Sequence, residues 1–432
     1  MDSLIISVVT LGCKVNQCES ASIVATLKSH NLSASEGLIP ADVYVLNTCS
    51  VTAEADKKSR QYITKMRKLN HNCNIIVVGC STQNNKERFV KPNVIAIGGT
   101  TEKSKFVLNT ILQIYNNNYY NTLSDRIVFD ENIEKIGECD RFCYENYPIS
   151  QKTRAFIKIQ DGCNRFCTYC IIPYLRGRSR SRSVEDILQE CASISSKEIV
   201  LTGIDVSYYG RDIGLTLSDL LNVLSNIPAR KRLGSLECEV VDERLLDAMA
   251  EGEYCPHFHL SLQSGNDSVL RSMNRHYNTD FFFGKIELIR KYFPLAGITT
   301  DVIVGFPTET DQFFNESVDF IRKCAFSDIH VFPYSSRAGT IASKKYTVLS
   351  PEIVKRRTDE LLSVKKELRE KFFTRNLGIV SSVYVEDKEN GHNVGYTPNY
   401  IKVYSDAPCG EIVYLKLEGK FADGMIGKII DK

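Results

Sequence analysis

Three cysteines stand close together near the middle of the chain, at Cys163, Cys167 and Cys170. Four-iron clusters usually take four cysteine thiolates, so a loop that supplies three leaves one iron free to bind a small molecule. The run at 155–160 has the composition of a strand, and the cysteine-bearing loop follows it. A structural zinc site is the alternative, but zinc spacings usually come as two separated pairs of cysteines. The spacing therefore favours an iron–sulfur cluster that takes part in chemistry.

Three more cysteines, Cys13, Cys49 and Cys80, each end an apolar run of strand length. The runs alternate with helix-like stretches, which predicts a parallel sheet covered by helices. Ligands of such sheets bind beyond the carboxyl ends of the strands, so cysteines at three of these ends can converge on one point. Cysteine also fills buried strand ends as a small apolar residue. The glycine or threonine before each cysteine favours the first interpretation, a second group of ligands.

The elements that would position these residues indicate an α/β fold with three domains. Residues 1–120 predict the parallel α/β sheet, and residues 121–148 predict a linker. Six strand-like runs separated by helical stretches lie within 149–378, and they predict a partial (β/α)6 barrel with a connector helix after it. The functional site of such a barrel lies at the carboxyl ends of its strands. Residues 379–432 hold short alternating strands split by turn residues, which predicts a small all-β barrel.

Composition limits the class of protein. The chain of 432 residues contains 15 cysteines, no apolar run long enough to span a membrane, and no basic leader at its first residues. We therefore expect a cytoplasmic protein whose thiols stay reduced and serve metal or redox chemistry. Cys139 and Cys143 in the linker lack partner cysteines, so they are only a weak indication of a third metal site.

Basic residues are clustered, although the net charge is only +2. Segment 57–68 holds six Lys or Arg and no acidic residue, and a solvated helix face is the simpler interpretation of it. The run RGRSRSR at 176–182 is denser, and like charges at that density repel unless something negative meets them. We expect this second run to contact a polyanion such as a nucleic acid.

The segment DGCNRFCTYCIIPYLRGRSRSR resembles the core motif of radical S-adenosylmethionine enzymes, and in particular of the methylthiotransferases. The segments TLGCKVNQCES, NTCSVTAEADKKSRQ and VVGCSTQ resemble the three cysteine motifs of that family's N-terminal domain. The resemblance implies two [4Fe–4S] clusters. The cluster that binds S-adenosylmethionine and splits it to methionine and a 5′-deoxyadenosyl radical would be held by Cys163, Cys167 and Cys170. The cluster that carries the transferred sulfur would be held by Cys13, Cys49 and Cys80. The resemblance also implies four contacts to S-adenosylmethionine, namely Gly203, Glu237, Gln263 and Arg275.

Within the family, LGCKVNQ and CSVT with KSRQ are most similar to the branch that acts on N6-threonylcarbamoyladenosine at position 37 of tRNA. The resemblance implies a methylthio group added at carbon 2 of that base, a tRNA anticodon loop as partner, and an electron donor such as flavodoxin or ferredoxin. The last domain resembles the TRAM domain, an RNA-binding module. Its composition is slightly acidic, so we expect its RNA contact to depend on local groups such as Lys402 and Tyr404.

Other substrates would keep the same chemistry. A second RNA branch acts on isopentenyladenosine, and its motif usually has glutamine and methionine where this chain has Lys14 and Val15. A third branch methylthiolates an aspartate of a small-subunit ribosomal protein, and it usually has proline at the position of Lys14. The alternative of a different class is a non-catalytic iron–sulfur RNA-binding protein. Formation of 5′-deoxyadenosine in the presence of a reductant would exclude it.

Overall fold

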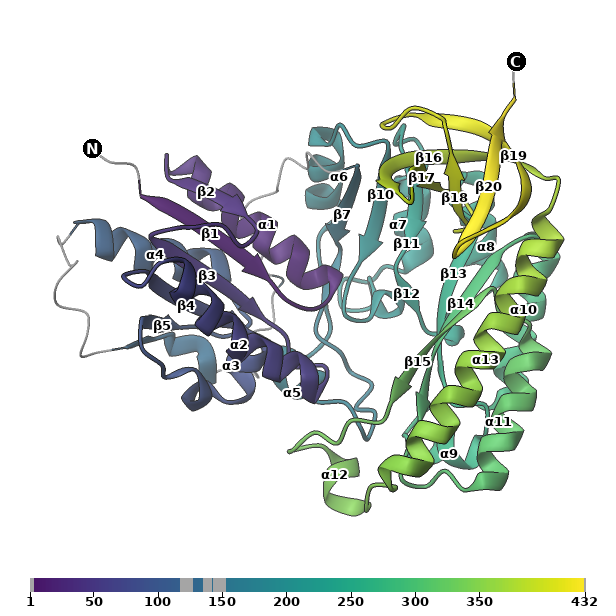
Figure 1. Ribbon diagram of the computed structural model, residues 1–432, viewed down its shortest axis with the longest axis horizontal. Helices are drawn as coiled ribbons and strands as arrows, with labels where there is room; N and C mark the ends of the chain where they lie inside the picture. The colour runs from purple at the N-terminus through teal and green to yellow at the C-terminus, as the bar shows by residue number, and fades with distance from the viewer. Residues whose placement is uncertain (1–3, 117–126, 135–141, 143–152, 431–432) are drawn as a thin grey trace.

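The computed structural model describes residues 4–116, 127–134, 142 and 153–430 (Figure 1). Its first unit is a six-stranded, fully parallel sheet in the order β2-β1-β3-β4-β5-β6. The strands are β1 (Ile5–Thr10), β2 (Ser33–Glu36), β3 (Val43–Thr48), β4 (Asn74–Gly79), β5 (Val94–Ile97) and β6 (Val128–Phe129). The three apolar runs that end in cysteines form β1, β3 and β4, which confirms the predicted parallel sheet.

Helices cover both faces of this sheet, so its central strands are apolar on both sides. Successive residues of a strand point to opposite faces. Val43 and Val45 accordingly pack with α1 (Lys14–Ser29) and α4 (Lys103–Asn116), whereas Tyr44 and Leu46 pack on the other face with α2 (Ala53–Leu69). Helix α2 begins where Thr52 accepts a hydrogen bond from the backbone of Ala55, which is a standard amino-terminal cap.

The second unit is a partial barrel of six parallel strand positions, as the sequence predicts, but its third strand is broken. The strands are β7 (Arg154–Lys158), β10 (Glu198–Thr202), β11 (Arg230–Leu233), β12 (Ser235–Leu236), β13 (His257–Gln263), β14 (Gly297–Val304) and β15 (Asp328–Pro333). At Gly234 the third strand changes sheet, because β11 pairs with β10 and β12 pairs with β13. Two parallel sheets, β11-β10-β7 and β12-β13-β14-β15, therefore make up the barrel wall.

Helices surround the outside of this wall and share one large apolar core with it. They are α6 (Val184–Ser193), α7 (Leu217–Val223), α8 (Glu243–Glu251), α9 (Asp267–Ser272), α10 (Thr279–Tyr292) and α11 (Asp311–Cys324). Two further helices are short, α5 (Ile172–Arg176) and α12 (Ile341–Lys345).

The long helix α13 (Pro351–Asn376) connects the partial barrel to the last unit. Its buried face repeats every three or four residues, at Leu361, Val364, Leu368 and Phe372, and the helix lies against β15. The last unit is a closed barrel in the order β16-β17-β18-β20-β19, which confirms the small all-β barrel. Its strands are β16 (Val380–Glu389), β17 (His392–Tyr396), β18 (Lys402–Ser405), β19 (Ile412–Phe421) and β20 (Gly424–Ile429). No helix in the described ranges has the length and hydropathy needed to cross a membrane.

Candidate functional site

The cysteines Cys13, Cys49 and Cys80 lie at one edge of the first sheet. Cys49 follows β3, Cys80 begins the short helix α3 (Cys80–Asn84) directly after β4, and Cys13 precedes α1. Strands β1, β3 and β4 are neighbours, so these positions come together as predicted. Gly12 has a φ of +104°, and a Cβ there would lie 2.5 Å from Cβ and 2.6 Å from Sγ of Cys49. Only glycine permits this close approach of the two cysteine-bearing segments.

The surroundings of this group combine burial on one side with exposure on the other. Cys49 and Cys80 are buried, whereas Cys13 is exposed to solvent. The pKa of the Cys49 thiol is raised to about 11, chiefly by burial, and the neighbouring thiols of Cys80 and Cys13 raise it further. The guanidinium of Arg176 opposes this shift, which brings a positive charge from the second unit to the edge of the first. A group of this kind is accessible from the side of Cys13.

The second group of cysteines lies on the loop between β8 (Gln160–Asp161) and α5. The backbone N–H of Cys163 donates to the carbonyl oxygen of Gly177 at 3.1 Å, and that of Cys170 donates to Cys167 at 3.0 Å. The backbone N–H of Thr168 donates to Met273 at 3.0 Å, which ties the loop to the end of α9. Burial raises the pKa of the Cys170 thiol to about 12, and the neighbouring Cys167 thiol raises it further. The loop thus holds its thiols together by backbone hydrogen bonds.

Of the four residues predicted to contact a cofactor, Arg275 contacts one of these thiols and Glu237 pairs with Arg275. The Arg275 Nη1 atom donates to Sγ of Cys167 at 3.2 Å, and its Nη2 atom forms an ion pair with Glu237. The same guanidinium donates to the carbonyl oxygen of Ser261 at 3.1 Å and to the hydroxyl of Tyr277 at 3.1 Å. Arg275 is therefore fixed from several sides, and it links the cysteine loop to the carboxyl end of β12.

The other two predicted residues, Gly203 and Gln263, are linked less directly to the loop cysteines. Gly203 follows β10, and a Cβ there would lie 2.9 Å from Oε1 of Gln160. That Oε1 atom accepts from the backbone N–H of Asp205 at 2.8 Å, and the Asp205 carboxylate lies 4.0 Å from Sγ of Cys163. Gln263 ends β13 in the left-handed region at a φ of +70°. Its side chain makes no hydrogen bond to the loop cysteines among the described residues.

Two charged residues beside the cysteine loop, Arg165 and Asp205, were not predicted from the sequence. Arg165 lies between two of the cysteines, and its Nε atom pairs with Asp205 at 2.8 Å and with Glu237 at 3.8 Å. It also pairs with Glu239 at 2.9 Å. The sequence shows Arg165 between Cys163 and Cys167, and it shows Asp205 two positions after Gly203, but neither residue by itself indicates its ion-pair partner.

The expectation that RGRSRSR meets an external polyanion is wrong for three of its four arginines. Arg176, Arg180 and Arg182 are buried, and each pairs with carboxylates of the protein itself. These pairs are Arg176 with Glu19 at 2.8 Å and Asp161 at 3.1 Å, Arg180 with Asp161 at 3.3 Å, and Arg182 with Glu190. Arg178 alone is exposed, and its guanidinium lies over the ring of Phe166 at 4.6 Å. The dense positive charge is therefore neutralised inside the fold.

Arg176 connects the two cysteine groups. It lies at the end of α5, directly after the second group's loop, and its Nη2 atom donates to Oδ1 of Asn16 at 2.9 Å on α1. Glu19, also on α1, accepts from Arg176, from Lys158 at 2.8 Å and from Lys103 at 2.5 Å. Because α1 begins right after Cys13, this buried network fixes the position of one group relative to the other.

The donors present in both groups are thiols. In the parts of the chain that the structure describes, no three His, Cys, Asp or Glu side chains are arranged to hold a single metal ion. Thiolates of a four-iron cluster bind different irons, so the sulfurs of such a group need not converge on one point. Cys139 and Cys143 lie outside the described residues.

Comparison with known proteins gives family matches for both the first unit and the partial barrel. Residues 157–321 match the model of the radical SAM superfamily, and residues 6–97 match that of the uncharacterized protein family UPF0004. The chain is 34% identical to the threonylcarbamoyladenosine tRNA methylthiotransferase MtaB of Bacillus subtilis, over 94% of this chain and 92% of that protein. It is 32% identical to the tRNA-2-methylthio-N(6)-dimethylallyladenosine synthase of Thermodesulfovibrio yellowstonii, over 98% of this chain and 97% of that protein.

The chain belongs to the radical S-adenosylmethionine methylthiotransferases. Among solved structures, this methylthiotransferase resembles the radical S-adenosylmethionine methyltransferase TsrM of Kitasatospora setae in fold, with a TM-score of 0.56 at 13% identity. The alignment covers 79% of this chain and 77% of TsrM. The family uses S-adenosylmethionine and [4Fe–4S] clusters. The two groups of thiols are a donor set that fits such clusters, and one group lies beside Gly12, where a Cβ would be crowded.

Proposed function

We propose that this methylthiotransferase adds a methylthio group to carbon 2 of N6-threonylcarbamoyladenosine at position 37, in the anticodon loop of tRNA. The observation that carries the proposal is the presence of two separate thiol groups, joined by the buried network around Arg176. One thiol group would suffice for cleavage of S-adenosylmethionine alone. A second thiol group is needed when the enzyme must also hold the sulfur that it transfers. The matching relatives named for threonylcarbamoyladenosine support the choice of substrate.

The proposal assigns one cluster to each group. Cys163, Cys167 and Cys170 would hold the first, and Cys13, Cys49 and Cys80 the second. When bound, these groups supply one-electron cleavage of S-adenosylmethionine and a site for the sulfur, and the electron would come from a donor such as flavodoxin or ferredoxin. In domain terms, residues 1–120 would provide the sulfur site, residues 149–378 the cofactor site, and residues 379–432 a further RNA contact.

The remaining residues of the site would hold the cofactor and shape its loop. Arg275 donates to Cys167 and is itself held by Glu237, so it keeps the cysteine loop against the barrel. Glu237 and Gln263 offer oxygen acceptors at strand ends, which suit the amino group and the sulfonium charge of S-adenosylmethionine. The absence of a side chain at Gly203 lets the chain pass close to Gln160. None of these residues needs to act as a general base, because the carbon 2–hydrogen bond of adenine is not usefully acidic.

Lys14 favours threonylcarbamoyladenosine over isopentenyladenosine. The threonylcarbamoyl group carries a carboxylate, whereas the isopentenyl group is apolar. Lys14 directly follows Cys13, its side chain is exposed, and its ammonium lies 5.6 Å from the ring centre of Phe156 on β7. Burial lowers the pKa of Lys14, as do the guanidinium groups of Arg154 and Arg232, and no ion pair joins Lys14 to a carboxylate in the described part of the chain. A free cation next to the proposed sulfur site suits the charged substituent.

The experiment is a reconstitution with defined substrates. The purified holoenzyme is given dithionite, S-adenosylmethionine and RNA hairpins that carry threonylcarbamoyladenosine, isopentenyladenosine or plain adenosine, and the nucleosides are then separated by mass spectrometry. We expect the methylthio product mainly from the threonylcarbamoyladenosine hairpin. Product mainly from isopentenyladenosine would support the second RNA branch, and 5′-deoxyadenosine without any RNA product would turn attention to the ribosomal-protein aspartate.

A tRNA substrate also implies a cytoplasmic enzyme, and the cysteines within the described ranges are free thiols.

A further inference from the structure

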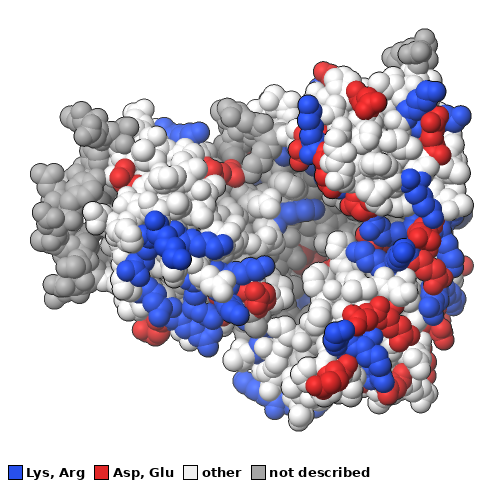
Figure 2. Space-filling model, viewed as in Figure 1, with Lys and Arg blue, Asp and Glu red and all other residues white. Residues whose placement is uncertain are grey.

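The exposed side of α2 carries lysines that have no carboxylate partner among the described residues. Lys57, Lys58, Lys65 and Lys68 are exposed, and in the described residues none of them lies within ion-pair distance of a carboxylate. By contrast, Arg60 on the same helix pairs with Asp56 at 3.3 Å. The four lysines, which we call the α2 lysine strip, extend over about 16 Å of helix at the usual rise per residue. Figure 2 shows Lys and Arg gathered over this part of the molecule.

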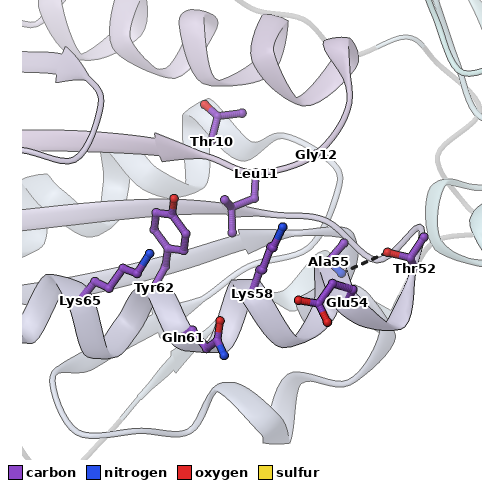
Figure 3. Close-up of a pocket in the computed structure, with 10 residues that line it drawn as sticks. All are labelled: Thr10, Leu11, Gly12, Thr52, Glu54, Ala55, Lys58, Gln61, Tyr62 and Lys65. Carbon is purple, nitrogen blue, oxygen red and sulfur yellow. Dashed lines mark hydrogen bonds between the residues drawn. The ribbon is translucent and has the colours of Figure 1, made fainter.

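The strip borders a pocket next to the first cysteine group. An open pocket of about 490 Å³ is lined on one side by α2, including Lys58, Tyr62 and Lys65. Its other side is the end of β1 at Thr10, Leu11 and Gly12. In Figure 3, Lys58 and Tyr62 point from α2 toward this end of β1. Gly12 directly precedes the exposed Cys13, so the pocket lies next to the segment that carries this cysteine.

The other basic groups that the sequence offered to RNA are neutralised. The run at 176–182 is mostly buried against Glu19, Asp161 and Glu190. In the closed barrel, the ammonium of Lys402 pairs with Glu389 at 2.7 Å and with Asp423 at 3.0 Å, and the hydroxyl of Tyr404 bonds to the same two carboxylates. The geometry therefore does not favour Lys402 and Tyr404 as the phosphate contact. A cation that already has two carboxylate partners adds little attraction for a phosphate.

We propose that Lys58 and Lys65, with the rest of the α2 lysine strip, bind the RNA backbone phosphates that flank the target nucleotide. The inference rests on the proposed function, because it needs an RNA whose base reaches the thiol group of Cys13, Cys49 and Cys80. A nucleotide with its base at that edge carries phosphates only a few ångströms away, and the strip lies at the border of this edge with no carboxylate paired to its lysines among the described residues. Lysine contacts to phosphates position an RNA without reading its sequence. The simple interpretation of 57–68 as a solvated helix face is then incomplete.

The test measures RNA affinity and its salt dependence. The holoenzyme is titrated into a fluorescently labelled anticodon stem–loop hairpin, and anisotropy is followed at several salt concentrations. The test variant is K58Q/K65Q, and the control variant is K323Q/K366Q. Both variants lose two positive charges. Lys323 and Lys366 are also exposed helix residues, and their helices α11 and α13 lie on the other side of the molecule from α2. Lys323 is a close match to Lys65, because each lies over an aromatic ring, at 4.2 Å and 4.4 Å.

We expect K58Q/K65Q to raise the Kd about tenfold at low salt and to reduce the slope of log affinity against log salt by about 1.4, the value for two lost contacts to a single strand. The control variant should match the wild type in both. Equal affinity and slope for the wild type and K58Q/K65Q would overturn the inference and leave the proposed function intact. Failure of the wild type to bind the hairpin would instead count against the proposed function. Iron content and thermal unfolding check that each variant is folded and loaded.

A second measurement needs no variant. Brief acetylation of the wild-type holoenzyme, followed by mass spectrometry of its peptides, reports how accessible each lysine is. We expect the hairpin to protect Lys58 and Lys65 several-fold while Lys323 reacts as before. Equal modification of all three with and without RNA would contradict the inference, even if a lysine variant failed to fold.

Discussion

At the scale of single residues, the two cysteine groups have the same donors, and the proposed function gives them separate tasks. The thiols of Cys49 and Cys170 have raised pKa values because they are buried, so they are protonated at neutral pH until iron displaces the proton. Arg275 donates to Cys167 in one group, and Arg176 brings its charge to the other. Substitutions in each group should therefore separate the two steps of the reaction.

The change Cys167→Ala removes the thiol that accepts from Arg275 in the group assigned to S-adenosylmethionine. Formation of 5′-deoxyadenosine should fall to background, because a cluster held by two thiolates loses the binding site for the cofactor. Chromatography of the products of a dithionite-driven reaction measures this. Cys409→Ala, at an exposed cysteine outside both groups, is the matched control and should leave the yield unchanged.

The change Cys49→Ala acts on the other group. Some cleavage of S-adenosylmethionine should remain while the methylthio nucleoside disappears, and iron should fall from about eight to about four atoms per chain, which is one four-iron cluster. Iron analysis and nucleoside mass spectrometry on the same sample give both numbers. A full yield of methylthio product from this variant would refute the assignment of two clusters.

We expect Lys14 to determine the preference between the two RNA substrates. Lys14→Gln should lower kcat/KM for the threonylcarbamoyladenosine hairpin about tenfold, the size of one lost charged hydrogen bond. The low activity on an isopentenyladenosine hairpin should not fall, and Lys14→Arg should restore most of the preference. An equal loss on both hairpins would mean that Lys14 supports the fold or the cluster rather than the substrate's carboxylate.

At the scale of elements, long apolar runs were predictable and short polar strands were not. The runs that became β1, β3, β4, β10 and β14 are buried on both faces or alternate clearly, so their composition alone predicts them. Strand β2, with the sequence SASE, and strand β17, with HNVGY, lack such a pattern. Both depend on pairing with neighbours, β2 with β1 and β17 with β16 and β18. The break of the third barrel strand at Gly234 likewise follows from pairing on both sides.

Helix α13 offers a test of packing at this scale. Leu361 is 1% exposed and its neighbour Leu362 is 47% exposed, so one faces the core and the other faces solvent. Leu361→Ala should lower the free energy of unfolding by about 2–4 kcal/mol, through lost burial and the cavity left behind. Leu362→Ala should change it by less than about 0.5 kcal/mol. Thermal unfolding of both variants compares them, and equal melting temperatures would contradict the described orientation of α13.

At the scale of the whole molecule, the arrangement of the units depends on charges that the sequence could not pair. The placement of three cysteines at neighbouring strand ends and of three in one loop, and the partial barrel, were predictable because spacing and strand ends are local properties. The partners of Arg176 were not, since Glu19 lies 157 residues away in sequence. The dense positive charge of RGRSRSR correctly indicated a negatively charged partner. The neighbouring sequence does not show whether that partner is RNA or a carboxylate of the protein itself. The same limit applies to Lys402, whose partners are Glu389 at the end of β16 and Asp423 in the turn between β19 and β20.

The central claim is that the chain makes the methylthio form of threonylcarbamoyladenosine in tRNA. Nucleoside mass spectrometry of tRNA from host cells with and without the gene tests it most directly. The account predicts that the 2-methylthio derivative disappears from the cells without the gene while threonylcarbamoyladenosine accumulates, and that a plasmid copy of the gene, but not of its Cys167→Ala variant, restores the derivative. An unchanged ratio of the two nucleosides in cells without the gene would contradict the claim.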